Sequence, residues 1–350
     1  MPSHPTVIVM NDTSTRYHHG CARVMRLLSQ GLEAAGLMII ARSPARHDWE
    51  NDPDFLQAVQ QADLIVINGE GTLHHGKPAG EALLRIATHP ARGNTPVALV
   101  NALYQDNPPE WGALLAQFSL LSARDSQSAT SMARASHQQV RWLPDLSLSA
   151  PAETPAHQRK GLIVGDSVRL DKRRDLARLA SQTPGARFIP TKTLRHAVWH
   201  LPLIGPFLRG VLFRLYNAVF PLHAPEFLMP MTEGAYLAEI AAAQLHITGR
   251  FHAVCLSMLT ETPFLALTSN ASKIEQLLRD AGLDGHRIVS VRDISAPPAS
   301  ADFSDQELKL IRAFRTRAQQ DADRLYRDLA DLARTHRDQP STSAMPRPAR

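Results

Sequence analysis

The sequence predicts an α/β protein with two Rossmann-like domains that face each other across a cleft. Short apolar runs alternate with segments of helical periodicity, which is typical of βαβ units and a parallel sheet. At 350 residues the chain exceeds the length at which one hydrophobic core usually stops growing. A polar, proline-containing stretch at 150–160 separates two series of these runs. Open parallel sheets bind ligands at the carboxyl ends of their strands, so polar residues that follow the strands are the candidate site residues.

The first domain is expected to cover residues 1–150. Residues 23–35 place apolar side chains on one helical face and are followed by Gly36, which predicts an amphipathic helix that ends there. The expected strands of this domain are the apolar runs at 7–10, 38–41, 64–68, 97–100 and 120–123, with a closing strand at 140–145.

The second domain is expected to cover residues 151–336, with an insertion at 194–223. A helix is predicted at 304–334 because apolar residues recur there at helical spacing. Residues 337–350 are rich in Pro and Ser and lack an apolar pattern, which predicts a disordered tail. The expected strands of this domain lie at 161–165, 187–190, 245–249, 264–267 and 287–290.

The composition limits the class of partner. The net charge is +5 and the pI is about 9.5, which favours anionic ligands. The charge is scattered and only 6% of the residues are aromatic, so nucleic acid is not an expected partner. Cys21 and Cys255 lie far apart without the spacing of a zinc site, and the first residues lack a signal-peptide pattern. We therefore expect a cytoplasmic protein.

Residues 63–72 contain the first candidate motif, a buried strand that runs directly into a glycine-flanked turn. Gly69 and Gly71 can bring the backbone close to a ligand, and the turn amides and the Thr72 hydroxyl can hold an anion. Asn68 and Glu70 add polar side chains at the carboxyl end of the strand. The alternative is a tight turn in which the glycines only supply positive φ and Glu70 is a charge near a helix N-terminus.

Polar loops follow two of the expected strands. Asn11 and Asp12 come directly after the first strand, and His18 and His19 follow them before the first helix. A second histidine pair at 74–75 follows the third strand. Adjacent histidines splay apart and no acidic cluster accompanies them, so we expect contacts to a phosphate or a sugar, and neither a metal nor a cofactor.

The segment at 249–253 carries the most informative pair of residues. Arg250 is a cation that never titrates, His252 titrates near neutrality, and both follow an apolar run. This pairing suits an anionic substrate that undergoes proton transfer, so we expect an enzyme. The alternative is a cation bonded to backbone carbonyls and a histidine of the core. Further expected substrate contacts are Lys273, Arg124 and Ser269.

Residues 194–220 combine high apolar content with three arginines and two prolines, which is too interrupted for a membrane-spanning helix. Aromatic residues beside arginines are typical of an element that lies on a membrane surface. The alternative is an internal helical insertion between strands.

Together the motifs resemble the polysaccharide pyruvyl transferase family, over about residues 7–283. Taken alone, the residues around positions 124 and 144 are ordinary helix-start and turn residues, and the order of the whole set carries the resemblance. The set comprises the polar loop with Gly20, the turn at 68–72, Arg124, Asp125 and Ser128 with Pro144 and Asp145, and the 249–253 motif with Thr262, Pro263 and Lys273.

The resemblance implies a glycosyltransferase-B-like pair of Rossmann domains and phosphoenolpyruvate as the donor. The implied product is a pyruvate ketal on a sugar of an exopolysaccharide or other cell-envelope glycan, or of its lipid-linked precursor. It also implies that Arg250 and His252 lie at the donor site. On this basis we expect Arg250 and Lys273 to bind the two anionic groups of the donor, His252 to act as general acid and Glu70 as general base.

Two other functions stay open at this point. The same frame could serve a glycosyltransferase that uses a nucleotide sugar, with the Arg250 region holding the diphosphate. Alternatively, the chain could be a non-catalytic scaffold of a polysaccharide assembly complex, bound at the inner face of the cytoplasmic membrane through 194–220.

Overall fold

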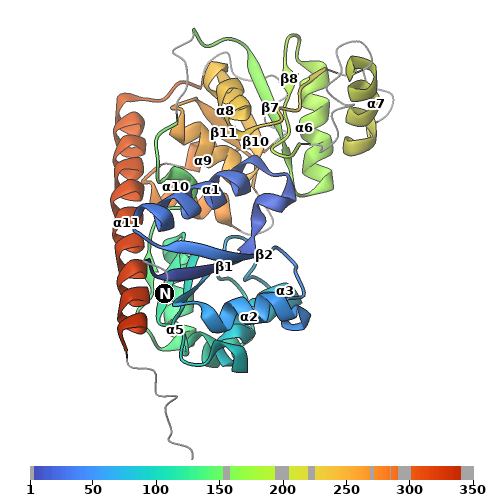
Figure 1. The fold of residues 1–350 in the computed structure, drawn as a ribbon. Helices are drawn as coiled ribbons and strands as arrows, with labels where there is room; N and C mark the ends of the chain where they lie inside the picture. The colour runs from blue at the N-terminus through green and yellow to red at the C-terminus, as the bar shows by residue number, and fades with distance from the viewer. Residues whose placement is uncertain are drawn as a thin grey trace, which may run out of the picture. The chain divides into compact units, whose positions relative to one another are not determined.

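The computed structural model describes residues 4–152, 158–193, 205–219, 225–268, 272–283, 285–290 and 301–339. Parallel strands alternate with helices along the chain, as Figure 1 shows, which confirms the α/β class. The strands are β1 (Thr6–Asp12), β2 (Met38–Pro44), β3 (Leu64–Asn68), β4 (Val97–Ala102), β5 (Leu120–Ala123), β6 (Arg141–Trp142), β7 (Leu162–Ser167), β8 (Arg187–Phe188), β9 (Glu226–Phe227), β10 (Leu245–Gly249) and β11 (Phe264–Ala266). The α-helices are α1 (His19–Ala34), α2 (Pro53–Gln61), α3 (Pro78–Leu84), α4 (Trp111–Leu115), α5 (Ser126–Ser136), α6 (Leu170–Gln182), α7 (Gly205–Asn217), α8 (Glu233–Ala242), α9 (Phe251–Leu259), α10 (Lys273–Asp280) and α11 (Asp305–Asp338).

The chain forms two compact units, and their boundaries differ from the expected division at residue 150. The first unit holds the described residues of Met1–Asp12, Leu28–Leu143 and Asp321–Arg350, and the second holds those of Thr13–Leu27 and Pro144–Gln320. Helices α1 and α11 therefore each contribute residues to both units. Membership of a unit depends on packing partners far away in the sequence, which local periodicity does not reveal.

The first unit contains a six-stranded parallel sheet in the order β2-β1-β3-β4-β5-β6. Strands β1, β3 and β4 are buried along their whole length, as expected for a sheet covered on both faces. The chain moves outward in one direction from β1 to β2 and in the other direction from β3 onward. The gap between β1 and β3 is therefore the topological switch point of this sheet, where open α/β sheets bind ligands.

The second unit contains a five-stranded parallel sheet in the order β11-β10-β7-β8-β9. Its switch point lies between β7 and β10, because β8 and β9 extend to one side and β11 to the other. The expected strand at 287–290 is wrong: this region has the 3₁₀ turn Gly285–Arg287 and a single bridge from Ile288 to Ala266. The buried Arg287 side chain donates to the carbonyls of Phe264 and Ala301 and so acts as an anchor.

Helix α11, drawn in red in Figure 1, extends beyond the predicted end at residue 334. Arg337 and Asp338 are helical, so the expected disordered tail does not begin at 337. The apolar stripe ends at Ala333, but the helix continues for another turn because charged side chains are tolerated on an exposed helix. His336 and Arg337 also suit the negative end of the helix dipole.

Candidate functional site

The first unit places polar side chains at the switch point between β1 and β3. The amide nitrogen Nδ2 of Asn11 donates to the Asn68 carbonyl at 2.6 Å and to Thr72 Oγ1 at 3.0 Å. Nδ2 of Asn68 lies 3.2 Å from Glu70 Oε2, and the Glu70 side chain is buried. The structure thus brings together four of the residues predicted from two separate motifs, at the predicted end of the sheet.

The backbone at these strand ends adopts the left-handed region at residues other than glycine. Asn11, Glu70 and Asn101 have φ values of 61°, 31° and 54°. Such conformations cost free energy and concentrate at functional sites. Neither Gly69 nor Gly71 has positive φ, so the turn is not explained by the flexibility of its glycines.

The two glycines of the turn have different environments. A Cβ on Gly69 would lie 2.5 Å from the Cβ of Ala102, so this glycine is required for packing of β3 against β4. A Cβ on Gly71 would have no atom within 4 Å among the described residues. Of the two, Gly71 is the position at which a ligand could approach the backbone.

Residues 124–128 behave as the start of a helix. Asp125 caps α5 by accepting the Ser128 amide at 2.6 Å and the Ser128 hydroxyl at 2.7 Å. The Ser128 hydroxyl in turn accepts the amide of Tyr104. Arg124 is buried directly after β5, on the same edge of the sheet as Asn11 and Glu70. The helix-start interpretation of Asp125 and Ser128 is confirmed, and Arg124 remains a predicted substrate contact.

The four histidines of the two polar loops are divided between the two units. His74 and His75 belong to the first unit, and His75 Nδ1 lies 3.4 Å from Asp106. His18 and His19 belong to the second unit. The His19 ring stacks on Tyr236 with 4.6 Å between ring centroids, and burial lowers the pKa of His19 to about 4. His19 is therefore a neutral packing residue at pH 7, which its position in the sequence does not reveal.

The second unit places a buried ion pair at its switch point. Arg250 follows β10 and donates through Nε to Oδ2 of Asp166 at 3.0 Å, with a further contact from Nη2. Asp166 lies near the end of β7, is fully buried, and also accepts the Thr191 amide at 3.0 Å and the Tyr216 hydroxyl at 2.8 Å. The Arg250 guanidinium is therefore held in one orientation by a residue of β7. Its Nε and Nη2 donate to Asp166.

Asp166, Tyr216 and Lys192 were missed from the sequence. Lys192 follows β8, and its pKa is lowered by partial burial, then by the nearby Arg250 cation, while Asp166 and Cys21 raise it. These charges thus lie within electrostatic reach of one another. The sequence offered a signal for Asp166, a charged residue near the end of the apolar run of β7.

His252 lies in the first turn of α9 and is buried against the start of α1. A Cβ on Gly20 would overlap the Cβ of His252 and lie 2.9 Å from its Nδ1, so only glycine allows this approach. Nε2 of His252 lies 3.8 Å from Oδ1 of Asp145, which is fully buried. The ring is therefore placed between α1 and a carboxylate. Asp145 also caps a short 3₁₀ turn by accepting the Ser147 amide, which confirms its turn role.

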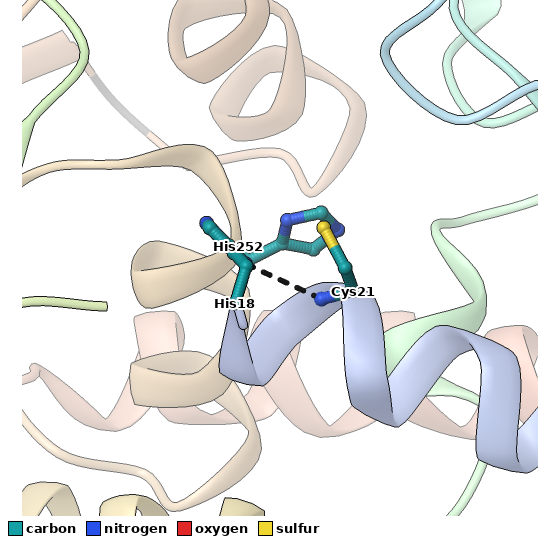
Figure 2. Close-up of side chains that lie close together, drawn as sticks. All are labelled: His18, Cys21 and His252. Atoms are coloured by element: carbon teal, nitrogen blue, oxygen red, sulfur yellow. Dashed lines mark hydrogen bonds between the residues drawn. The ribbon is translucent and has the colours of Figure 1, made fainter. Parts of the chain in front are cut away.

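His18, Cys21 and His252 form a buried cluster, shown in Figure 2. One potential ligand atom of each side chain lies within 4.8 Å of the others. The amide of Cys21 donates to Nδ1 of His18 at 3.3 Å, which is the dashed line in Figure 2. We call these three residues the His–Cys–His cluster.

The remaining predicted residues are less informative. Asp12 lies at the end of β1, with an oxygen 3.7 Å from Arg42. Lys273 is the half-buried first residue of α10. Ser269 lies outside the described residues, as do positions 194–204 and 220–223 of the expected insertion.

Two Rossmann-like units, each with a parallel sheet, give the chain a glycosyltransferase-B-like fold. Solved structures with this fold include UDP-bound MnaA of S. aureus, with 13% identity, coverage of 93% of this chain and 91% of that chain, and a TM-score of 0.50. A second is an α,α-trehalose-phosphate synthase (UDP-forming) from Burkholderia xenovorans, with 12% identity, coverage of 95% and 100%, and a TM-score of 0.50. At this identity the likeness establishes the fold.

The model of the polysaccharide pyruvyl transferase family matches residues 7–270. The chain therefore belongs to this family and is a transferase that acts on glycans, which confirms the predicted family and enzyme class. No curated protein matches the sequence. Among the described residues, no helix is long and apolar enough to cross a membrane.

Proposed function

We propose that the protein transfers a pyruvyl group from phosphoenolpyruvate to two hydroxyls of one sugar, in a surface polysaccharide or its lipid-linked precursor. The two sugar oxygens bond to C2 of the donor, its phosphate leaves, and one proton converts the methylene carbon to a methyl group, so that a cyclic pyruvate ketal forms. The second hydroxyl proton leaves with the phosphate. The cationic switch point of the second unit is the observation that supports this donor.

Phosphoenolpyruvate carries a phosphate and a carboxylate, so its site needs cationic groups that are fixed in position. Arg250 and Lys192 lie within electrostatic reach at the carboxyl ends of the strands, and Asp166 fixes Arg250. The donors of Arg250 that face away from Asp166 would contact one anionic group, and Lys192 the other. Lys192 thus takes the place that we expected for Lys273, which sits on α10.

The sugar hydroxyls need a base, and we assign this role to Glu70. Its carboxylate is buried at the switch point of the first unit, and Asn68 donates to it. A positioned general base contributes about 10²–10⁴-fold to the rate. His252 is assigned to the donor site, where its loss should abolish turnover.

Thermal shift and phosphate release test the donor. We expect phosphoenolpyruvate at about 100 times its dissociation constant to stabilise the protein by roughly 2.7 kcal/mol. Arg250→Lys should lose this shift, because Lys cannot donate through two fixed nitrogens. Arg169→Lys is the matched control, since Arg169 is an exposed partner of Asp171 in the same unit. Stabilisation by UDP-sugars and not by phosphoenolpyruvate would instead select a nucleotide-sugar transferase.

We also propose that the second unit binds the cytoplasmic face of an anionic membrane, where a lipid-linked acceptor would lie. Phe207, Val211 and Leu215 recur every four residues on α7 and are 74%, 37% and 64% exposed, so they form one apolar stripe. Val168 and Leu170 at the start of α6 are also exposed.

Helices α6 and α7 lie side by side (Figure 1), and the Arg173 guanidinium stacks on the Tyr216 ring at 4.1 Å. Residues 172–174 of α6 are all basic. Basic groups beside an exposed apolar stripe fit a membrane surface with anionic lipids. The proposed membrane surface therefore includes α6 in addition to the segment 194–220 that was predicted from the sequence.

Liposome sedimentation tests this surface. Phe207→Ser combined with Leu215→Ser should reduce binding to vesicles with anionic lipid, and added salt should weaken binding by the wild type. Met38→Ser is the control, because Met38 is an exposed apolar residue of the first unit. Equal binding by the double variant and the wild type would refute the proposal.

A further inference from the structure

The His–Cys–His cluster combines donor atoms that come from distant parts of the chain. His18 directly precedes α1 and Cys21 lies three positions later in its first turn, whereas His252 lies on α9. All three side chains are buried. In the portion of the chain that the structure describes, this is the one group of at least three His, Cys, Asp or Glu side chains close enough to share a metal ion.

The donor set is that of a transition-metal site. A thiolate and two imidazoles are ligands that select zinc, whereas magnesium and calcium prefer oxygen. Zinc–sulfur and zinc–nitrogen bonds of about 2.3 and 2.0–2.1 Å place tetrahedral ligand atoms roughly 3.3–3.6 Å apart. The atoms of the cluster lie within 4.8 Å of one another, so small side-chain rotations would bring them to bonding distance.

The three side chains lie close together, as Figure 2 shows. The His18 and His252 rings are 5.3 Å apart, and Nδ1 of His18 lies over the first turn of α1, next to the Cys21 amide. Binding of a metal through this nitrogen would replace one long hydrogen bond. Because Gly20 has no side chain, Nδ1 of His252 faces the same turn.

Asp145 is placed where a carboxylate could orient the ring of His252 as a metal ligand. Its Oδ1 lies 3.8 Å from Nε2 of His252, on the side of the ring opposite to α1. Histidine ligands usually donate their other ring N–H to a carboxylate or carbonyl, which fixes the tautomer and the ring orientation. The arrangement Asp145, His252 and a metal at Nδ1 would have this form.

We propose that His18, Cys21 and His252 bind one zinc ion, with Asp145 as the residue that orients His252. Three protein ligands leave a fourth position for water or an oxygen of the substrate. The expectation of no metal considered the histidine pairs at 18–19 and 74–75, and it missed the cysteine and the distant histidine. The proposal makes His252 a ligand in place of a general acid. Binding of the zinc ion does not depend on the proposed function. Binding of a substrate oxygen at the fourth coordination position does.

Metal analysis of the untagged full-length protein tests the proposal. After incubation with zinc and removal of the excess, we expect about one zinc per chain in the wild type. Cys21→Ala and His252→Ala should lose it. Cys255→Ala is the matched control, because Cys255 is the other buried cysteine and lies outside the cluster. Asp145→Asn should weaken zinc affinity by about 10–100-fold and leave the stoichiometry at saturation unchanged.

Cobalt binding can be tested by absorption spectroscopy of the wild-type protein, so the result does not depend on whether a variant folds. Cobalt in the wild type should produce a thiolate-to-cobalt charge-transfer band in the near ultraviolet, and this band should persist in Cys255→Ala. A wild type that holds no zinc and shows no such band would overturn the proposal. A protein that binds zinc but is not stabilised by phosphoenolpyruvate would keep the metal site and lose the proposed donor, so the two failures are distinguishable.

Discussion

Replacing Asp166 with Asn should destabilise the protein by about 3–5 kcal/mol, because it leaves the Arg250 cation buried without a partner. Burial by itself would raise the pKa of Asp166, but the adjacent Arg250 guanidinium holds that pKa below its usual range. The carboxylate is therefore charged at neutral pH and pairs with Arg250 through Nε and Nη2. Urea unfolding of the variant and the wild type measures the difference.

The same substitution should lower turnover by at least about 10²-fold, since Arg250 would lose the group that sets its position. Asp171→Asn is a matched control, because Asp171 also pairs with an arginine in the second unit but is exposed. Its effect on stability should be much smaller, because solvent screens this exposed ion pair. Equal losses of stability and turnover in the two variants would show that the burial of Asp166 does not increase the effect of the substitution.

Replacing Glu307 with Gln should destabilise the protein by about 2–3 kcal/mol at pH 7. Burial alone would raise the pKa of Glu307, but its hydrogen bond with Arg287 is among the interactions that lower it to about 2. Arg287 is only 2% exposed, and its Nη2 lies 2.9 Å from Glu307 Oε2. The variant would leave this buried guanidinium without its carboxylate.

The effect of Glu307→Gln should depend on pH. The pKa of Glu307 is lower in the folded protein than in the unfolded chain, so its contribution to stability is complete above the unfolded pKa of about 4.5 and is lost as the pH falls toward 2. The difference in urea midpoint between variant and wild type should therefore shrink below about pH 4.5. Glu81→Gln is the control, because the side chains of both Glu81 and its partner Arg85 are exposed. A difference that stays constant down to pH 3 would contradict the assignment.

The strands at the centre of the first sheet could be predicted because β1, β3 and β4 each contain an apolar run. The bounds of β3, β5 and β10 match the predicted runs, and α1 ends two residues before Gly36, which has a φ of 84°. Strands that depend on pairing more than on composition were not predictable. The two-residue strand β9 is an example, and the expected strand at 287–290 failed because Arg287 anchors a turn.

The sequence by itself determined the fold class, the family and the polar residues that end the strands. Hydrophobic periodicity and the residues at turns are local properties, so they can be read along the chain. This is why Asn11, Asn68, Glu70 and Arg250 were found in advance.

Only the tertiary structure decided which of these residues meet. Asp166 and Arg250 are 84 residues apart and become partners because β7 and β10 are neighbours in the sheet. Cys21 and His252 meet because Gly20 allows α9 to approach α1. Strand order and helix packing result from burial of the whole core. The charge pairs and the His–Cys–His cluster therefore depend on contacts that no local segment encodes.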